Sequence, residues 1–163
     1  MVVVGDSSVL IALKRIGHQP LLHTLYGQVH VPDAVWREVF ASATPAHSVP
    51  TVPPWIVRHQ VRDPSVGESL RDQLDRGEIE AILLARELAA DLLLIDERLG
   101  RQAARRFGVP VRGLLGVLAD ARRRGHVPAL APLLRRLREN GFWIADDLIE
   151  ETLRAVGEAS PSP

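Results

Sequence analysis

Short runs of aliphatic, mostly β-branched residues alternate along this chain with segments of helical periodicity, and this alternation sharply limits the possible folds. Strands are predicted at 2–4, 28–31, 92–95 and 109–111, with a weaker fifth at 55–61. Pro32 fits the first turn of a helix that runs to about Ala41. Strands that alternate with helices are typical of parallel sheets, so the pattern predicts an α/β fold, layered α/β/α, with a mostly parallel central sheet.

One domain accounts for nearly the whole chain. The sequence has 163 residues, of which 46% are hydrophobic, enough to fill one core. A loop rich in proline and small residues is expected at 41–54, and a helical C-terminal part at 114–157. We therefore expect a single domain over 1–157 and a flexible tail at 158–163.

Charge and composition exclude several classes of protein. Basic and acidic residues number 20 each, so attraction to a polyanion would have to come from local patches. The chain has no cysteine, which excludes a disulfide scaffold, a thiolate metal site and a cysteine nucleophile. The opening segment has neither a basic start nor a long apolar run, so we expect a soluble cytoplasmic protein that makes no membrane contact.

Two aspartates directly follow predicted strands. Asp6 comes after "VVVG" and Asp96 after "LLLI". Open α/β sheets bind their ligands at the carboxyl ends of their strands, so this position favours a functional site. Each aspartate also precedes a helical segment, where Asp is a favoured N-cap, and capping stays open as the alternative.

Two glutamates fall on the apolar sides of predicted helices. A projection at 100° per residue places Glu38 among Val31, Val35 and Val39, and the same projection places Glu78 in the apolar stripe of the helix beginning near residue 77. Glu80 and Glu87 project to the opposite side, where we expect solvent. A glutamate in a first helical turn can instead simply favour the helix dipole.

If these four carboxylates meet in one cleft, their mutual repulsion has to be relieved. A hard cation such as Mg²⁺ or Mn²⁺ prefers oxygen ligands and usually binds a few carboxylates together with waters or substrate phosphate. Such a site suits phosphodiester hydrolysis. The hypothesis needs neither a histidine nor a cysteine.

The same segments carry a family resemblance. "VVVGDSSVLIAL", "VPDAVWREV", "LDRGEIEAILLA" and "LLLIDERLGR" resemble the four acid-bearing motifs of the PIN-domain ribonucleases, in particular the compact prokaryotic branch akin to VapC-type toxins. The matches run from residue 2 to about 112, and the helical remainder also resembles this branch. The third acid, often Asp in that family, is here Glu78, and Glu97 stands where a fifth acid can help.

The resemblance implies an activity and partners. Asp6, Glu38, Glu78 and Asp96 would form the acidic quartet of a Mg²⁺- or Mn²⁺-dependent endoribonuclease, with the number of metal ions left open. It also implies frequent homodimerisation and a cognate antitoxin protein. Ser7 is expected to orient a metal-bound water or to cap the first helix.

Arginines supply the local positive charge that an RNA substrate needs. Arg98, Arg101 and Arg105 follow the proposed ligand Asp96 and are the candidate phosphate contacts. Further arginines at 122–124 and 135–138 equally fit ordinary solvated helix faces. Trp36 and Phe40, one turn apart, are expected to serve packing and not base stacking.

Two other functions remain open on the sequence. A phosphoacceptor signalling module also places Asp at strand ends with Mg²⁺, but it usually needs a lysine from a late strand. The sole lysine here, Lys14, lies in the first predicted helix. A PIN-like domain that binds RNA or protein without cleavage is the second alternative.

Overall fold

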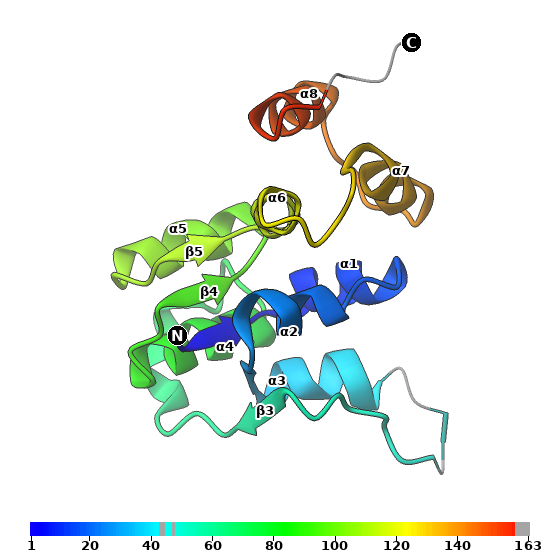
Figure 1. Cartoon of the computed structure of the whole chain (residues 1–163). Helices are drawn as coiled ribbons and strands as arrows, with labels where there is room; N and C mark the ends of the chain where they lie inside the picture. The colour runs from blue at the N-terminus through cyan, green and yellow to red at the C-terminus, as the bar shows by residue number, and fades with distance from the viewer. Residues whose placement is uncertain (43–44, 47, 159–163) are drawn as a thin grey trace.

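A computed structural model describes residues 1–42, 45–46 and 48–158. Its centre is a five-stranded sheet in the order β3-β2-β1-β4-β5, in which every neighbouring pair is parallel (Figure 1). The strands are β1 (Val3–Gly5), β2 (Val29–Pro32), β3 (Ile56–His59), β4 (Leu92–Leu94) and β5 (Val111–Arg112). The predicted α/β fold is thus confirmed, including the weaker strand at 55–61.

Helices connect the strands and cover both faces of the sheet. They are α1 (Ser7–Arg15), α2 (Pro20–Tyr26), α3 (Asp33–Trp36), α4 (Arg76–Glu87), α5 (Arg98–Arg106), α6 (Leu114–Arg123), α7 (Ala131–Glu139) and α8 (Asp146–Ala155). A π-helical segment η1 (Arg37–Ala41) extends α3, and a 3₁₀ segment η2 (Pro64–Leu70) precedes α4. The helix predicted from Pro32 to Ala41 is therefore present, with a change of hydrogen-bonding pattern partway along it.

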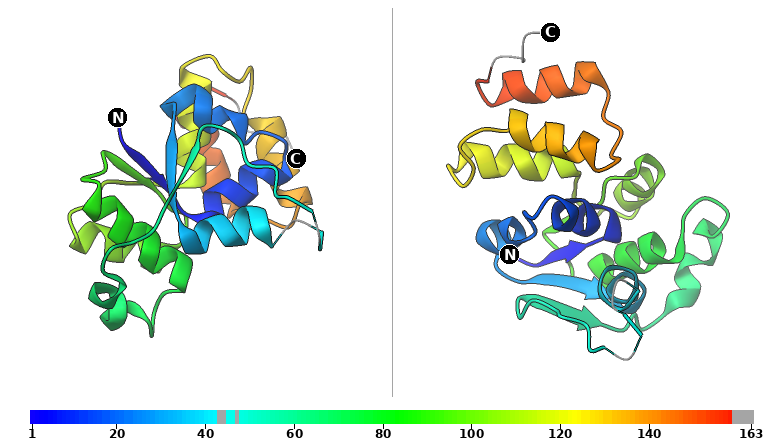
Figure 2. Two further views of the ribbon diagram at one scale, coloured as in Figure 1. Left: turned by 90° about the horizontal axis from the view of Figure 1, so that it is seen from below. Right: turned by 90° about the vertical axis from the view of Figure 1, so that its right-hand side faces the viewer.

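The central strands are fully buried because helices lie on both sides of them. Val3, Val4, Leu93 and Leu94 have no exposed surface, as expected for aliphatic strands of a parallel sheet. Figure 2 shows α4 on one side of the sheet and α1, α2 and α6 on the other. The C-terminal helices α6, α7 and α8 lie together at the end of the molecule farthest from β3 (Figure 1). None of the helices in the described part of the chain combines the length and apolar character needed to cross a bilayer.

The strand order reverses between β1 and β4. From β1 the chain proceeds outward to β2 and β3, and it then returns to add β4 and β5 on the other side. Gly5 pairs with Leu94, and the backbone N–H of Asp6 donates to the carbonyl of Leu94 at 2.9 Å. A crevice forms where the order reverses, at the carboxyl ends of these two strands. The fold therefore brings Asp6 and Asp96 to the same edge.

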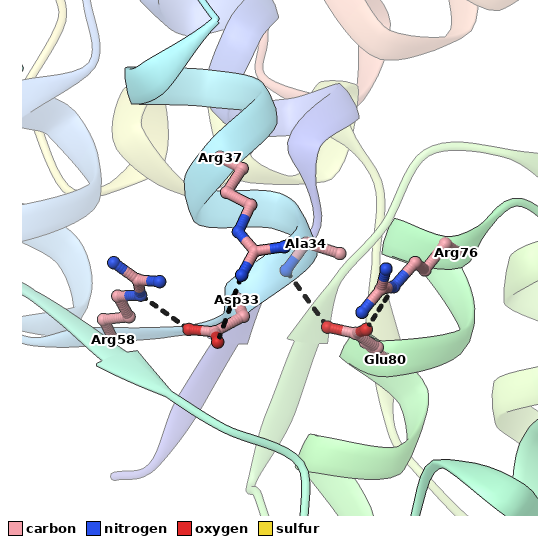
Figure 3. Close-up of polar contacts among 6 residues, drawn as sticks. All are labelled: Asp33, Ala34, Arg37, Arg58, Arg76 and Glu80. Atoms are coloured by element: carbon pink, nitrogen blue, oxygen red, sulfur yellow. Dashed lines mark hydrogen bonds and ion pairs between the residues drawn. The ribbon is translucent and has the colours of Figure 1, made fainter.

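The expectation that Glu80 faces solvent is wrong. Its side chain is buried, not solvated, and it accepts hydrogen bonds from the backbone N–H of Ala34 at 3.0 Å and from Nε of Arg76 at 2.7 Å (Figure 3). The reason is tertiary: α3 packs against this side of α4, and the free N–H groups of its first turn need an acceptor. Asp33 in the same turn pairs with Arg58 and Arg37. Glu87, by contrast, is exposed as expected.

Hydrogen bonds to Glu158 connect the C-terminal helices α6 and α7. Its carboxylate accepts from the backbone N–H groups of Leu130 and Ala131, at the start of α7, and from Nε of Arg122 in α6. Burial raises the pKa of Glu158, but these hydrogen bonds outweigh it and leave the pKa lowered. Glu158 was expected to open the flexible tail, and the rest of that segment, 159–163, lies outside the described residues.

Glu158→Gln is expected to destabilise the protein at neutral pH by roughly 1–3 kcal/mol, because a charged acceptor of buried backbone donors is lost. Chemical denaturation measures the effect. Glu151→Gln, at an exposed position of α8, is the matched control and should be neutral. Equal stability of the two variants would contradict a fastening role for Glu158.

Candidate functional site

A cleft of about 330 Å³ opens at the carboxyl ends of β1 and β4. Six carboxylates from the described part of the chain line it, and we call it the acidic cleft: Asp6, Glu38, Asp75, Glu78, Asp96 and Glu97. All four acids predicted from the sequence, and the additional Glu97, are thus brought together. Asp75 is a sixth acid that the sequence analysis did not select.

Asp6 both caps a helix and faces the cleft. It is the N-cap of α1, where Oδ2 accepts from the backbone N–H of Ser8 at 3.3 Å and from the Ser8 hydroxyl at 2.8 Å. The other oxygen, Oδ1, is buried and has no hydrogen-bond donor among the described residues. The capping alternative and the site hypothesis therefore both apply, each to one oxygen of the same carboxylate.

Asp96 does not cap the helix that follows it. Instead its Oδ1 accepts from the backbone N–H of Leu114, at the start of α6, at 2.9 Å. Its own backbone N–H donates to the Ser8 hydroxyl at 3.2 Å. Ser8 therefore connects the acids of β1 and β4 directly: its hydroxyl donates to Asp6 and accepts from Asp96.

Glu78 is fixed in position by the N-terminus of α4. Asp75 and Glu78 form a capping box, in which Asp75 Oδ1 accepts from the Glu78 N–H at 2.9 Å and Glu78 Oε2 accepts from the Asp75 N–H at 3.0 Å. A Cβ atom on Gly100 would lie only 3.0 Å from Glu78 Oε1 and 2.5 Å from Ile95. The lack of a side chain at Gly100 thus allows α5 to approach the buried glutamate.

Glu38 lies in the cleft but not on the buried face predicted for it. Its side chain is exposed, whereas its neighbours Val39 and Phe40 are buried. The projection assumed an α-helix throughout, and the i→i+5 bonding of η1 changes the angular spacing of the side chains. Glu38 therefore faces the acidic cleft from η1, with Oε2 near Gly77 at the start of α4.

Burial changes the protonation of two of these acids. Desolvation raises the pKa of Asp6 to about 6, although the hydrogen bonds from Ser8 lower it in part. Desolvation likewise raises the pKa of Glu78 to about 7, and the charges of Asp75, Asp6 and Glu97 raise it further. At neutral pH the cleft therefore favours either a retained proton or a compensating cation.

The oxygen atoms in the cleft suit a hard divalent cation that is bound together with waters. All the candidate ligands are oxygens, and Asp6 Oδ1 is a buried acceptor still without a donor among the described residues. No three His, Cys, Asp or Glu side chains in the described ranges are already gathered closely enough for a metal ion. An open arrangement of this kind suits Mg²⁺, which keeps several waters and typically takes one or two protein carboxylates.

The predicted arginines divide into two groups. Arg101 lies beside the cleft, with Nη1 3.9 Å from Asp96 Oδ1. Arg98 and Arg105 are exposed on α5 and line none of the cleft. Sequence reasoning missed Arg15, which lines the cleft from the end of α1 and stacks over the Phe142 ring.

The roles of Asp75 and Ser8 in positioning the site could have been recognised from the sequence. The "DRGE" stretch at 75–78 has the spacing of a capping box, and Ser8 stands two residues after a strand-end aspartate, the position of an N-cap hydrogen bond. Ser7, the predicted water-orienting residue, is buried in the first turn of α1 and lines the cleft. The hydrogen bonds between the acids, however, are made by Ser8.

The positions of Lys14, Trp36 and Phe40 bear on the phosphoacceptor alternative and on the expected packing role of the two aromatic residues. Lys14 Nζ donates to the carbonyl of Val39 and lies over the Phe40 ring, and Lys14 does not line the acidic cleft. That placement disfavours a phosphoacceptor module. Trp36 and Phe40 contact one another with ring centroids 6.3 Å apart, and Phe40 is buried, as expected for packing residues.

Comparison with known proteins identifies one family. A family model described as a PIN domain matches residues 2–158, which include the whole acidic cleft and all eight helices of the described chain. No curated protein sequence matches the chain.

The raised pKa values predict how stability depends on pH when no metal is present. Both carboxyls titrate higher in the folded chain than at their ordinary values of 3.8 and 4.5, so their contribution is complete below about pH 4 and is lost as the pH rises through 6 to 7. In EDTA we expect the free energy of unfolding to fall between about pH 4 and pH 8 by several kcal/mol, since each unit of pKa shift corresponds to about 1.4 kcal/mol. Saturating Mg²⁺ or Mn²⁺ should restore it at pH 8.

Glu78→Gln isolates the contribution of one acid, because Gln keeps the acceptor of the capping box without the charge. The variant should show a flatter pH profile in EDTA and a smaller thermal shift with Mn²⁺. Identical profiles for wild type and variant would disprove the assignment of a raised pKa to Glu78.

Proposed function

Because the chain belongs to the PIN-domain family, whose members are generally nucleases, we propose that it is a divalent-metal-dependent endoribonuclease. The observation that carries this proposal is the acidic cleft at the β1–β4 edge. A phosphodiester is itself an anion, so a cleft lined by carboxylates repels it unless cations are present. Charge thus argues for metal-dependent binding and hydrolysis of the substrate.

Asp6 and Asp96 are the residues best placed to hold the ion, with Glu78 beside them. Asp6 offers the buried Oδ1, and Asp96 lines the cleft with an exposed side chain that the Leu114 N–H holds in place. Glu38 and Glu97 also line the cleft and would act through waters. When bound, Mg²⁺ or Mn²⁺ would lower the pKa of an attacking water and neutralise charge on the phosphate and the leaving oxygen.

Neighbouring groups hold these carboxylates in place. Ser8 sets the spacing of Asp6 and Asp96, and the Leu114 N–H fixes the orientation of Asp96. Asp75 anchors Glu78 through the capping box. These hydrogen bonds reduce the conformational entropy that the acids lose when a cation and a phosphate bind.

RNA is the proposed substrate because the PIN-domain family supports a ribonuclease-type activity, and arginines near the acids would contact its phosphates. Arg15 lines the cleft and Arg101 lies beside Asp96, and both can form forked hydrogen bonds to phosphate oxygens. Arg98 and Arg105 would extend this contact along α5. A non-cleaving RNA-binding domain is the alternative that an activity measurement must test.

Asp6→Asn and Asp96→Asn are expected to lower metal-stimulated RNA cleavage at least about 100-fold, because ligand losses should exceed the 10- to 100-fold cost of losing outer-sphere partners. Asn keeps the hydrogen-bond acceptor in both places, so the fold should be retained. Cleavage of total RNA with Mn²⁺ or EDTA measures the effect, and circular dichroism checks the fold. Full activity of either folded variant would contradict the ligand assignment.

Glu78→Gln and Glu80→Gln form a matched pair on one helix. Glu78→Gln should lose activity. Glu80→Gln should stay active in its folded fraction while losing roughly 1–2 kcal/mol of stability, because the charged contact to Arg76 and the Ala34 N–H is weakened. If Glu80→Gln lost activity without losing stability, the separation of roles between these two residues would be wrong.

We further propose that this nuclease is the toxin of a toxin–antitoxin pair and acts on cytoplasmic RNA. The support is chemical. The carboxylates of the open cleft can bind a basic side chain of an inhibitor, and the arginines beside the cleft can pair with the inhibitor's carboxylates. The cognate antitoxin would be a small protein encoded next to this one. Homodimerisation belongs to the same proposal and is checked by light scattering.

Expression of the wild-type protein alone is expected to slow growth, and Asp6→Asn should relieve the effect. Asp72→Asn, an exposed aspartate outside the cleft, is the matched control and should remain toxic. Co-expression of the adjacent open reading frame should restore growth. Toxicity that persists in Asp6→Asn would separate growth arrest from cleavage.

A further inference from the structure

Trp143 is unusually exposed for a tryptophan. Its side chain is 88% accessible, whereas Trp36 and Trp55 are both half-buried. It lies in the segment between α7 and α8, directly after Phe142, which lines the acidic cleft. A large aromatic surface in water is unfavourable, so such a residue commonly marks a binding surface.

A second pocket lies beneath this tryptophan. It has a volume of about 300 Å³ and is formed between the first turn of α6 and the segment that leads into α8. Leu114, Leu115 and Leu148 give it apolar walls, and Gly113 and Gly116 also line it. We call it the Trp143 pocket.

The Trp143 pocket adjoins the acidic cleft. Asp96 and Leu114 line both, and Arg101 lies at the junction, close to Asp96. The absence of a side chain at Gly113 lets Asp96 and Arg101 approach closely at the junction, because a Cβ there would lie 2.8 Å from Asp96 Oδ1 and 3.0 Å from Arg101 Nη1. A polymer whose phosphate lies in the acidic cleft would therefore place an adjacent unit in this pocket.

We propose that the Trp143 pocket binds the base of a nucleotide next to the scissile phosphate, with Trp143 as the stacking surface and Arg101 contacting the connecting phosphate. This inference rests on the proposed nuclease function and adds a substrate subsite to it. Aromatic side chains stack on splayed bases of single-stranded RNA, whose flat faces match the apolar walls. The adjoining guanidinium complements the phosphate that an apolar peptide would lack.

The role of Trp143 follows from its position. It does not line the acidic cleft, so it acts on substrate affinity and on the choice of cleavage site. Removing it should raise KM and leave kcat nearly unchanged, because stacking is equal in the ground state and the transition state.

Binding of single-stranded oligoribonucleotides with Ca²⁺ in place of Mg²⁺ or Mn²⁺ tests the proposal with a hard cation in the cleft, and gel electrophoresis checks that the RNA stays intact. Trp143→Ala should weaken binding roughly 5- to 100-fold, and Trp143→Phe should retain most of the affinity. Wild-type tryptophan fluorescence should be quenched by RNA, and Trp143→Phe should lose most of this quenching. Val66→Ala, at an exposed apolar position of η2 outside both pockets, is the matched control.

An abasic site moved along the oligonucleotide identifies the base involved. At one position it should weaken wild-type binding as much as Trp143→Ala does, and there it should have no further effect on that variant. Unchanged RNA affinity in Trp143→Ala would overturn the subsite. If that variant changed the oligomeric mass but not the RNA affinity, Trp143 would belong to a protein interface instead.

The outcomes separate this proposal from the nuclease assignment. If Trp143→Ala weakens RNA binding but the wild type cleaves no RNA with Mn²⁺, the base subsite stands and the nuclease activity fails. If the wild type cleaves RNA and Trp143→Ala does so with the same KM and the same cleavage sites, the nuclease stands and the subsite is wrong.

Discussion

Pairing of β1 with β4 is the interaction on which the site depends. The register that joins Gly5 to Leu94 places Asp6 and Asp96 at one edge, although 90 positions separate them in the sequence. The hydroxyl of Ser8 then bonds to both residues. Because the strand order reverses at this pair, the helices that follow β1 and β4 lead away on different sides and leave the edge open. The buried aliphatic strands thus position the carboxylates.

Concentrating acids in this cleft has an energetic cost. Burial and mutual repulsion raise the pKa of Glu78 to about 7, so the folded chain resists ionising it at neutral pH. A protein uses such an arrangement when a cation or a proton compensates the charge, which is a common feature of functional sites. The surrounding hydrogen bonds from Ser8, Leu114 and the capping box meet the acids' acceptor needs in part. They leave Asp6 Oδ1 without a donor among the described residues.

The C-terminal helices contribute to the site as well as to the core. The N–H of Leu114 at the start of α6 orients Asp96, and Phe142 and Trp143 line two adjoining pockets. Glu158 joins α6 and α7 through hydrogen bonds from Arg122, Leu130 and Ala131. Because these contacts attach the C-terminal part to the proposed reaction site, its packing sets the shape of the surface next to the acids.

The parallel α/β fold could be predicted from the sequence, since the alternation of strand and helix patterns is local, and the position of Asp6 and Asp96 after strands marked them as candidates. The sequence also predicted the burial of Glu78, because α4 is a regular helix and its projection places Glu78 among apolar residues. The environments of two glutamates depend on contacts between elements: Glu80 is buried because α3 covers it, and Glu38 faces the cleft from a π-helical segment. Helical projection assumes one hydrogen-bonding pattern and one buried face. Contacts between elements change both, so residues such as Asp75, Arg15 and Trp143 gain their positions only when the chain is folded.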